Sequence, residues 1–214
     1  MGKITALQLS KSKKRVSVFL SDSSSFIIDR NVAEEVGLRK GLDLSIDQVK
    51  ELLESDLYHR CFDAAVHLLA YRPRSGLEMK QRLYKRGFRD DIASKTLLRL
   101  REQNLINDEA FAQYWKDTRL SFNPRSRRLI KYELMRKGIP SETADEATSD
   151  LDDTAAAYKA GLKKARLISS MDYGEFRRRL SNYLKWRGFS YEIIDNVSER
   201  LWQEKQDASK QFVL

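Results

Sequence analysis

A segment of similar sequence occurs three times in this chain of 214 residues. In each copy a basic residue directly precedes a glycine, and a second basic residue lies within the two positions before that residue. The three glycines, Gly87, Gly138 and Gly188, are 51 and 50 positions apart. A fixed period of this size is typical of an array in which one supersecondary unit recurs and stacks on its neighbours. The period restricts the fold more than any other feature, because every copy must adopt a similar local structure.

The residues before each glycine predict a helix. Apolar residues lie eight and four positions before the glycine in every copy, and this i, i+4 spacing places both on one helical face. A glycine that follows a basic last turn is typical of a helix C-terminus, where a left-handed residue ends the helix and cations are favoured by the helix dipole. The apolar pairs are Met79 and Leu83, Ile130 and Leu134, and Leu180 and Leu184.

Two copies share the sequence Pro-Arg-Ser before this helix, at 73–75 and 124–126, whereas the third copy reads Tyr173-Gly174-Glu175. Proline disfavours continuation of the preceding helix, and a serine then caps the next one. Each copy is therefore expected to contain a first helix before the proline, a middle helix up to the glycine and a third helix after it. The expected helices are 56–70, 75–86 and 91–103, then 108–121, 126–137 and 141–152, then 154–169, 174–187 and 190–204.

The first part of the chain has a different pattern. Arg15–Leu20 alternates apolar and polar residues like a half-buried strand, and 26–28 is expected to pair with it across a turn. Residues 4–9 add a possible third strand. A short helix capped by Asn31 and another over 46–54 complete a small α/β module.

These patterns predict a mainly α fold, a tandem array of three three-helix units preceded by a small N-terminal α/β module. The expected domains are 1–54 for the N-terminal module, 55–106 for the first unit, 107–153 for the second, and 154–214 for the third with the C-terminal tail.

Basic residues recur on or next to the middle helix of every copy. The net charge is +9, which favours an acidic or polyanionic partner. On a single helix such residues would simply indicate a solvated face, but their recurrence in three copies favours a binding surface, and both interpretations stay open. The candidate partner-binding residues are Arg72, Arg74, Lys85, Arg86, Arg125, Arg127, Arg128, Lys131, Arg136, Lys137, Arg177, Arg178, Lys185 and Arg187.

No sequence pattern indicates catalysis. The two histidines, His59 and His67, lie on one expected helix without cysteines or carboxylates at metal-ligand spacing around them. There is no phosphate-binding glycine-rich loop and no nucleophile motif. The acidic pairs 90–91 and 152–153 fall at expected helix starts, where the helix dipole stabilises carboxylates. We therefore expect no enzymatic activity, no cofactor and no metal.

The single cysteine and the tryptophans are assigned to the core. Cys61 cannot form an internal disulfide, and its apolar neighbours at helical spacing indicate a small buried residue rather than a reactive thiol. Trp115, Trp186 and Trp202 lie on expected helices and are predicted to be core residues rather than base-stacking platforms. No apolar run is long enough to span a bilayer, and no signal peptide is recognisable, so a cytoplasmic location is expected.

Several of these segments resemble the RecX family of recombinase regulators. The stretch 69–75, the sequence Lys85-Arg86-Gly87-Phe88 and the stretch 105–112 are similar to its signature, and the later copies continue the pattern in order over about 55–205. The resemblance implies tandem three-helix units in a bacterial cytoplasmic protein.

It also implies RecA on single-stranded DNA as the partner. Members of the family bind the RecA nucleoprotein filament along its groove and dampen its ATP hydrolysis, strand exchange and coprotease activity, which places them in homologous recombination, DNA repair and the SOS response. The alternative is a helical module that binds DNA directly, which the basic helices would permit.

Overall fold

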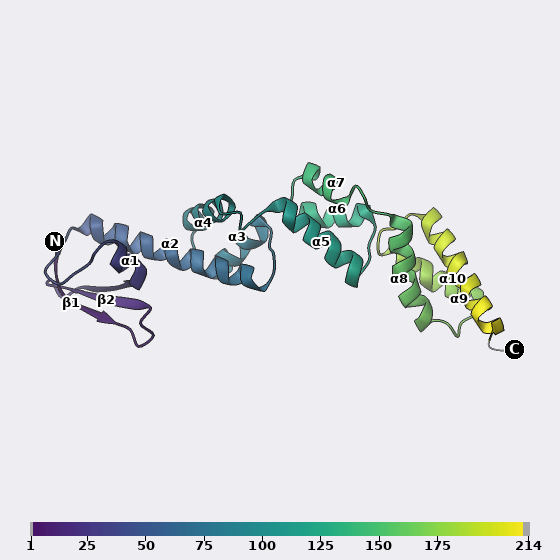
Figure 1. Cartoon of the computed structure of the whole chain (residues 1–214), viewed down its shortest axis with the longest axis horizontal. Coiled ribbons are helices and arrows are strands. Elements are labelled where there is room, and N and C mark those ends of the chain that lie inside the picture. The colour runs from purple at the N-terminus through teal and green to yellow at the C-terminus, as the bar shows by residue number, and fades with distance from the viewer. Residues whose placement is uncertain (1, 212–214) are drawn as a thin grey trace. The chain divides into compact units, whose positions relative to one another are not determined.

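The computed structural model describes residues 2–211, and this range contains ten helices and four strands (Figure 1). The chain divides into two compact units between Ile106 and Asn107. The first unit holds the N-terminal sheet and the first copy of the repeat, and the second unit holds the second and third copies. The expected fold class, mainly α with a small N-terminal α/β module, is confirmed.

The N-terminal module is built on a four-stranded antiparallel sheet in the order β3-β2-β1-β4. Val16, Val18 and Leu20 alternate with more exposed residues along the second strand, so that every second side chain enters the core. The expected strands are present, and a further short one pairs with the start of the first. The strands are β1 (Gly2–Leu9), β2 (Arg15–Leu20), β3 (Ser25–Asp29) and β4 (Asp43–Leu44).

Helix α1 (Arg30–Glu35) follows β3 directly. The expectation that Asn31 caps it is wrong, because the carboxylate of Asp29 accepts a hydrogen bond from the Asn31 amide at 2.9 Å. Asp29 ends β3 in an extended conformation, so one residue closes the strand and starts the helix.

Helix α2 (Ile46–Tyr71) is a single helix of 26 residues, where two helices over 46–54 and 56–70 were expected. Ser45 caps it in a reciprocal capping box with Gln48. The segment 46–71 contains no glycine or proline that would break the helix. Asp56, which is buried, connects the helix to the sheet. The Asp56 carboxylate accepts hydrogen bonds from the Arg15 guanidinium at 3.2 Å and from the Asp29 amide at 2.6 Å.

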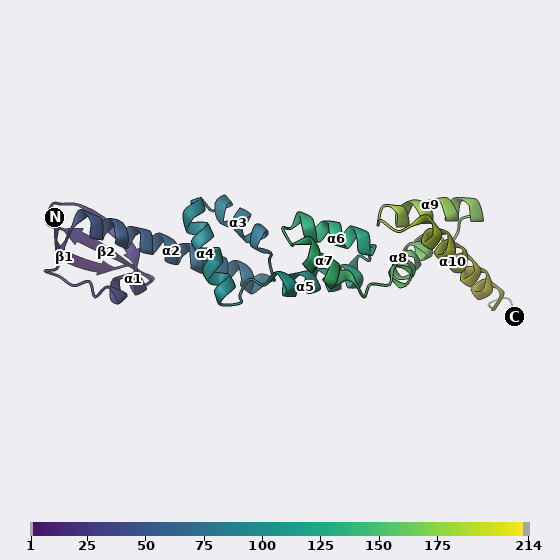
Figure 2. The same ribbon diagram turned by 90° about the horizontal axis from the view of Figure 1, so that it is seen from above.

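Eight more helices complete the three copies of the repeat within the described residues (Figure 2). The first copy combines the C-terminal half of α2 with two further helices, and each later copy has three of its own. Most bounds agree with the expected ones to within a few residues. The helices are α3 (Gly76–Lys85), α4 (Asp90–Glu102), α5 (Asp108–Phe122), α6 (Arg127–Arg136), α7 (Ser141–Thr148), α8 (Asp153–Leu167), α9 (Tyr173–Lys185) and α10 (Tyr191–Gln211).

Each copy has its own apolar core, and the middle helix contributes to it in the same way every time. The apolar pair that precedes each glycine, beginning with Met79 and Leu83, is fully buried in all three copies. Cys61 belongs to the first core, as predicted, and burial raises the pKa of its thiol above the ordinary value. The buried, largely protonated thiol is a poor nucleophile.

The three glycines end the middle helices in the left-handed conformation, with φ of 86° at Gly87, 83° at Gly138 and 84° at Gly188. Their surroundings differ. A Cβ atom at Gly87 would meet open space, whereas one at Gly188 would lie 2.6 Å from the Ser126 hydroxyl and 3.0 Å from the Leu129 Cβ. Gly188 therefore permits close packing of the third copy against the second.

We expect Gly188→Ala to cost more stability than Gly87→Ala. A left-handed alanine costs about 1–2 kcal/mol at either position, and overpacking at Gly188 adds about 1–3 kcal/mol. Urea unfolding followed by circular dichroism measures both costs. Equal costs would mean that the contact of Gly188 with Ser126 and Leu129 does not constrain the fold.

A basic surface on the middle helices

The middle helices α3, α6 and α9 start from capping residues that differ between the copies. The hydroxyls of Ser75 and Ser126 accept hydrogen bonds from the amides three residues later, both at 3.2 Å, as the Pro-Arg-Ser sequence predicts. In the third copy the Asp172 carboxylate accepts from the Glu175 amide at 3.1 Å. The third copy thus keeps a capped middle helix although its sequence lacks the motif.

At the C-terminal end of every middle helix, an exposed basic residue lies next to a large, solvent-exposed side chain. Because the buried pair of each helix lies on one side, the residues just after it lie on the other. Trp186, which is 85% exposed, is the most prominent of these side chains. The exposed pairs are Tyr84 with Lys85, Met135 with Arg136, and Trp186 with Lys185.

The prediction that Trp186 is a core residue is therefore wrong. It lies two positions after buried Leu184, which places it on the opposite side of α9. Trp115 and Trp202 do pack, partly buried, against the cores of the second and third copies.

Helix α6 carries a set of exposed charges. Arg128, Tyr132 and Arg136 follow one another at i, i+4 and i+8 on what we call the outer face of α6, and all three are exposed. The Arg136 guanidinium lies 5.9 Å from the centroid of the Tyr132 ring. Within the described residues, neither arginine pairs with a carboxylate, and the same holds for the exposed side chain of Arg127. Their charges are available to a partner.

Lys131 and Lys137, on the flanks of α6, are engaged with neighbouring side chains. The Lys131 ammonium is 2.6 Å from the Asp145 carboxylate of α7, and the Lys137 ammonium lies 4.1 Å over the Trp115 ring.

Helices α9 and α10 enclose an open groove of about 450 Å³ with a basic lining. Arg177 pairs with Asp195 and Arg178 pairs with Glu175, at 3.1 and 3.0 Å. These bonds raise the pKa of both arginines and lower that of Glu175. The lining includes Tyr173, Arg177, Arg178, Lys185, Tyr191 and Asp195.

The groove could accept an anionic group between its basic side chains. The Lys185 ammonium lies 5.6 Å over the Tyr191 ring and has no carboxylate partner among the described residues. An anion that enters would compete with Asp195 for Arg177, so its binding must be weaker than the number of cations suggests.

The candidate residues of the first copy have largely structural roles. Arg72 donates two hydrogen bonds to Glu78, at 3.1 and 3.0 Å. Arg74 is only 8% exposed, and its Nε donates to the Leu68 carbonyl at 3.0 Å; burial lowers its pKa. Arg86 donates to the Ala64 carbonyl at 3.3 Å. We therefore leave Arg74 out of the surface, which in this copy rests on exposed Lys85.

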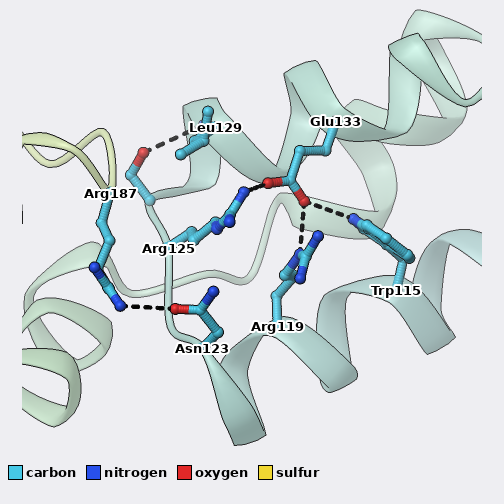
Figure 3. A network of polar contacts seen from close by, with 8 residues as sticks. Trp115, Arg119, Asn123, Arg125, Leu129, Glu133 and Arg187 are labelled. Atoms are coloured by element: carbon cyan, nitrogen blue, oxygen red, sulfur yellow. Dashed lines mark hydrogen bonds and ion pairs between the residues drawn. The ribbon is translucent and has the colours of Figure 1, made fainter. Parts of the chain in front are cut away.

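Arg125 belongs to a partly buried network rather than to the outer face (Figure 3). The carboxylate of Glu133, whose side chain is 12% exposed, accepts hydrogen bonds from the Trp115 indole at 2.8 Å, from Arg119 at 2.7 Å and from Arg125. Burial is the main cause that lowers the pKa of Arg119 and Arg125. One carboxylate thus holds two guanidinium groups between α5 and α6.

Arg187 connects this region to the third copy, as Figure 3 also shows. Its guanidinium donates to the Asn123 side chain at 2.9 Å. It also lies 3.7 Å from the centroid of the Tyr183 ring. Its carbonyl accepts a hydrogen bond from the Ser126 amide at 3.0 Å. Arg187 therefore positions α9 relative to α6 instead of presenting its charge to a partner.

Sequence reasoning did not find the Glu133 network. In the sequence, Glu133 is simply the single acidic residue of a basic helix, and nothing local marks it as the centre of a network. The recurrence of an arginine in both Pro-Arg-Ser motifs, Arg74 and Arg125, was the available signal that these side chains serve the fold.

The described residues contain no group of three or more His, Cys, Asp or Glu side chains placed to hold a metal ion. No helix in that part of the chain is long and apolar enough to cross a membrane.

Comparison with protein families gives two matches, both to one family. Residues 61–100 match the first three-helix domain of RecX, and residues 107–147 match its second three-helix domain.

Full-length relatives and solved structures agree. The regulatory protein RecX of Halalkalibacterium halodurans is 30% identical over 206 residues, which cover 92% of this chain and 77% of the relative. That of Clostridium perfringens strain SM101 is 26% identical over 207 residues, covering 94% and 97%. A crystal structure of a regulatory protein RecX has the same fold, with a TM-score of 0.70 at 22% identity over 93% of this chain and all of that one. RecX from Lactobacillus salivarius has a TM-score of 0.57 at 26% identity, covering 69% of this chain and 97% of that one.

Proposed function

The chain belongs to the RecX family of regulatory proteins, and on this basis we propose that it binds the RecA filament on single-stranded DNA and restrains it without catalysing a reaction itself. In this proposal the chain acts in the bacterial cytoplasm. It lowers the ATPase, strand-exchange and coprotease activities of RecA. RecA is proposed as the partner because the motifs of this chain resemble those of RecA regulators.

The observation that carries the proposal is the repeated outward pairing of a cation with a large side chain on α3, α6 and α9. Aromatic and arginine side chains contribute most of the energy at many protein interfaces. An array that presents several weak contacts on one chain binds a repeating partner much more strongly than any single contact does. A RecA filament is such a partner.

The ATPase activity of RecA on single-stranded DNA tests the regulatory part of the proposal. We expect the rate of hydrolysis to fall as the chain is added, and the chain alone to hydrolyse no ATP. An unchanged rate in the presence of chain equimolar with RecA would contradict the proposal.

Variants of the residues that most resemble catalytic groups should still regulate. Asp152 caps α8, where its carboxylate accepts hydrogen bonds from the Thr154 and Ala155 amides at 2.8 and 3.1 Å. We expect Asp152→Ala to lower the stability by about 1 kcal/mol and to leave inhibition of the RecA ATPase intact, as should His67→Ala. Loss of inhibition by a folded variant would indicate a chemical role for that residue.

Direct DNA binding is the second candidate, and the outer face of α6 together with the groove of α9 and α10 favours it. Exposed arginines next to aromatic rings suit phosphates and unstacked bases. Binding to single-stranded DNA alone should weaken with salt, with a log–log slope of about −0.7 per phosphate contact. A steep slope that is identical with and without RecA would favour this candidate.

A further inference from the structure

The N-terminal sheet has an open edge along β1. On one side β2 pairs with β1 up to Leu9. On the other side β4 covers only Gly2 and Lys3, and the loop before β4 reaches no further than the backbone of Ile4. Residues 5–9 therefore have a strand on one side only.

The backbone groups of Leu7 and Leu9 point to this open side. The Ser10 amide donates to the Arg15 carbonyl at 2.8 Å, so Ser10 faces β2. Residues of an antiparallel strand face its two neighbours alternately. Gln8 therefore also faces β2, and Leu7 and Leu9 present their N–H and C=O groups outward. The segment 5–9 contains no charged residue and no proline, which are the usual protection of an edge strand.

A mainly apolar groove lies along the same edge. The side chains of Leu7 and Leu9 are 37% and 51% exposed, although they lie on the face of the sheet that carries Val16 and Val18. They line a groove of about 290 Å³ together with Val16, Ala33 and Leu38. The lining also includes Arg30 and Glu34, whose charges are paired with each other at 2.6 Å. An open edge next to an apolar groove suits an added strand, which gains affinity from main-chain hydrogen bonds and specificity from alternate side chains.

Basic residues flank both ends of this edge. One group lies in the turn that follows Leu9, and the other in the loop that contacts Ile4; all are exposed, and none forms an ion pair within the described residues. They are Lys11, Lys13 and Lys14 in the turn, and Arg39 and Lys40 in the loop.

We infer that the open edge of β1 binds an extended segment of a partner protein as an additional strand, and that this segment has alternating apolar residues and acidic ends. The apolar residues fit the groove beside Leu7 and Leu9, and the acidic ends meet the two basic groups. A second copy of this chain fits less well, because pairing of β1 with β1 brings the basic turn of each copy towards the basic loop of the other. The inference does not depend on the surface of the middle helices.

Hydrogen exchange of the full chain tests the inference residue by residue. The probe is a synthetic peptide of alternating valine and threonine with three aspartates at each end. We expect the peptide to protect the amides of Leu7 and Leu9, which exchange rapidly in the free protein, while the amide of Gln8 is protected in both states. A peptide with lysines in place of the aspartates should bind at least about tenfold more weakly, because it meets like charges.

Two variants separate the contributions to binding. Leu9→Pro removes an outward N–H group and should weaken peptide binding about tenfold. Lys11→Glu with Lys14→Glu leaves the strand intact and should weaken binding of the acidic peptide by a similar factor while improving that of the lysine peptide.

Three results would overturn the inference. The first is that the acidic peptide does not protect Leu7 and Leu9 at millimolar concentration. The second is that their protection rises with protein concentration in the absence of peptide, which would identify a second copy as the occupant. The third is that a single-stranded oligonucleotide protects the same amides as well as the peptide does.

Discussion

Reversal of Arg128 and Arg136 to glutamate on the outer face of α6 should weaken binding to RecA filaments about a hundredfold. Each arginine can make a charge-assisted contact worth about 1.5–3 kcal/mol, and the new carboxylates would repel the acidic groups that these arginines met. The fold should survive, because both side chains are exposed and exposed charges contribute little to stability. Fluorescence anisotropy of labelled filaments measures binding, and circular dichroism verifies that the variant melts like the wild type.

The matched control reverses Lys159 and Lys163 on α8. These lysines are four residues apart and exposed, and among the described residues they form no ion pair, so the net charge changes by the same amount. The control should bind almost normally. Equal loss in both variants would show that only net charge matters, and no loss in either would mean that the basic faces are merely solvated.

Glu133→Ala should lower the stability of the second unit by about 2–3 kcal/mol, a value between the costs for exposed and for fully buried ion pairs. The change leaves Arg119 and Arg125 without their shared carboxylate in a partly buried place, and it removes the acceptor of the Trp115 indole. Tryptophan fluorescence during urea unfolding measures the loss, because all three tryptophans belong to the second unit.

Glu133→Gln is the control for this change. It keeps the shape of the side chain and one acceptor oxygen but loses the negative charge. Its stability should therefore lie between those of the wild type and the alanine variant. A cost of Glu133→Ala below about 1 kcal/mol, the usual value for an exposed pair, would contradict the role of Glu133 as the centre of the network.

The helical repeat could be predicted because its signals are local and occur three times. Serine caps, apolar pairs and left-handed glycines depend on neighbouring residues, and the structure has all of them where the sequence places them. The continuity of α2 could not be predicted in this way. In the sequence Asp56 looks like the polar first residue of a second helix, and only its contacts with Arg15 and the Asp29 amide explain why it is buried within one continuous helix.

The candidate surface could be predicted only as a set of basic helices. Arg125 and Arg128 are three residues apart and look alike in the sequence, but one is held by Glu133 and the other is exposed without a carboxylate partner among the described residues. The difference depends on α5, which supplies Arg119 and Trp115 around the same carboxylate. Such side-chain roles follow from tertiary packing, and no local pattern contains them.

Co-sedimentation with RecA filaments on single-stranded DNA tests the proposed function most directly. The sample and a control without RecA are centrifuged at increasing salt concentrations. We expect the chain to stay in the pellet with the filaments at salt concentrations that release it from naked DNA, because the proposed contacts with protein include the exposed side chains of Tyr132 and Trp186 in addition to charges. If the chain sediments equally at every salt concentration with and without RecA, the filament is not its partner.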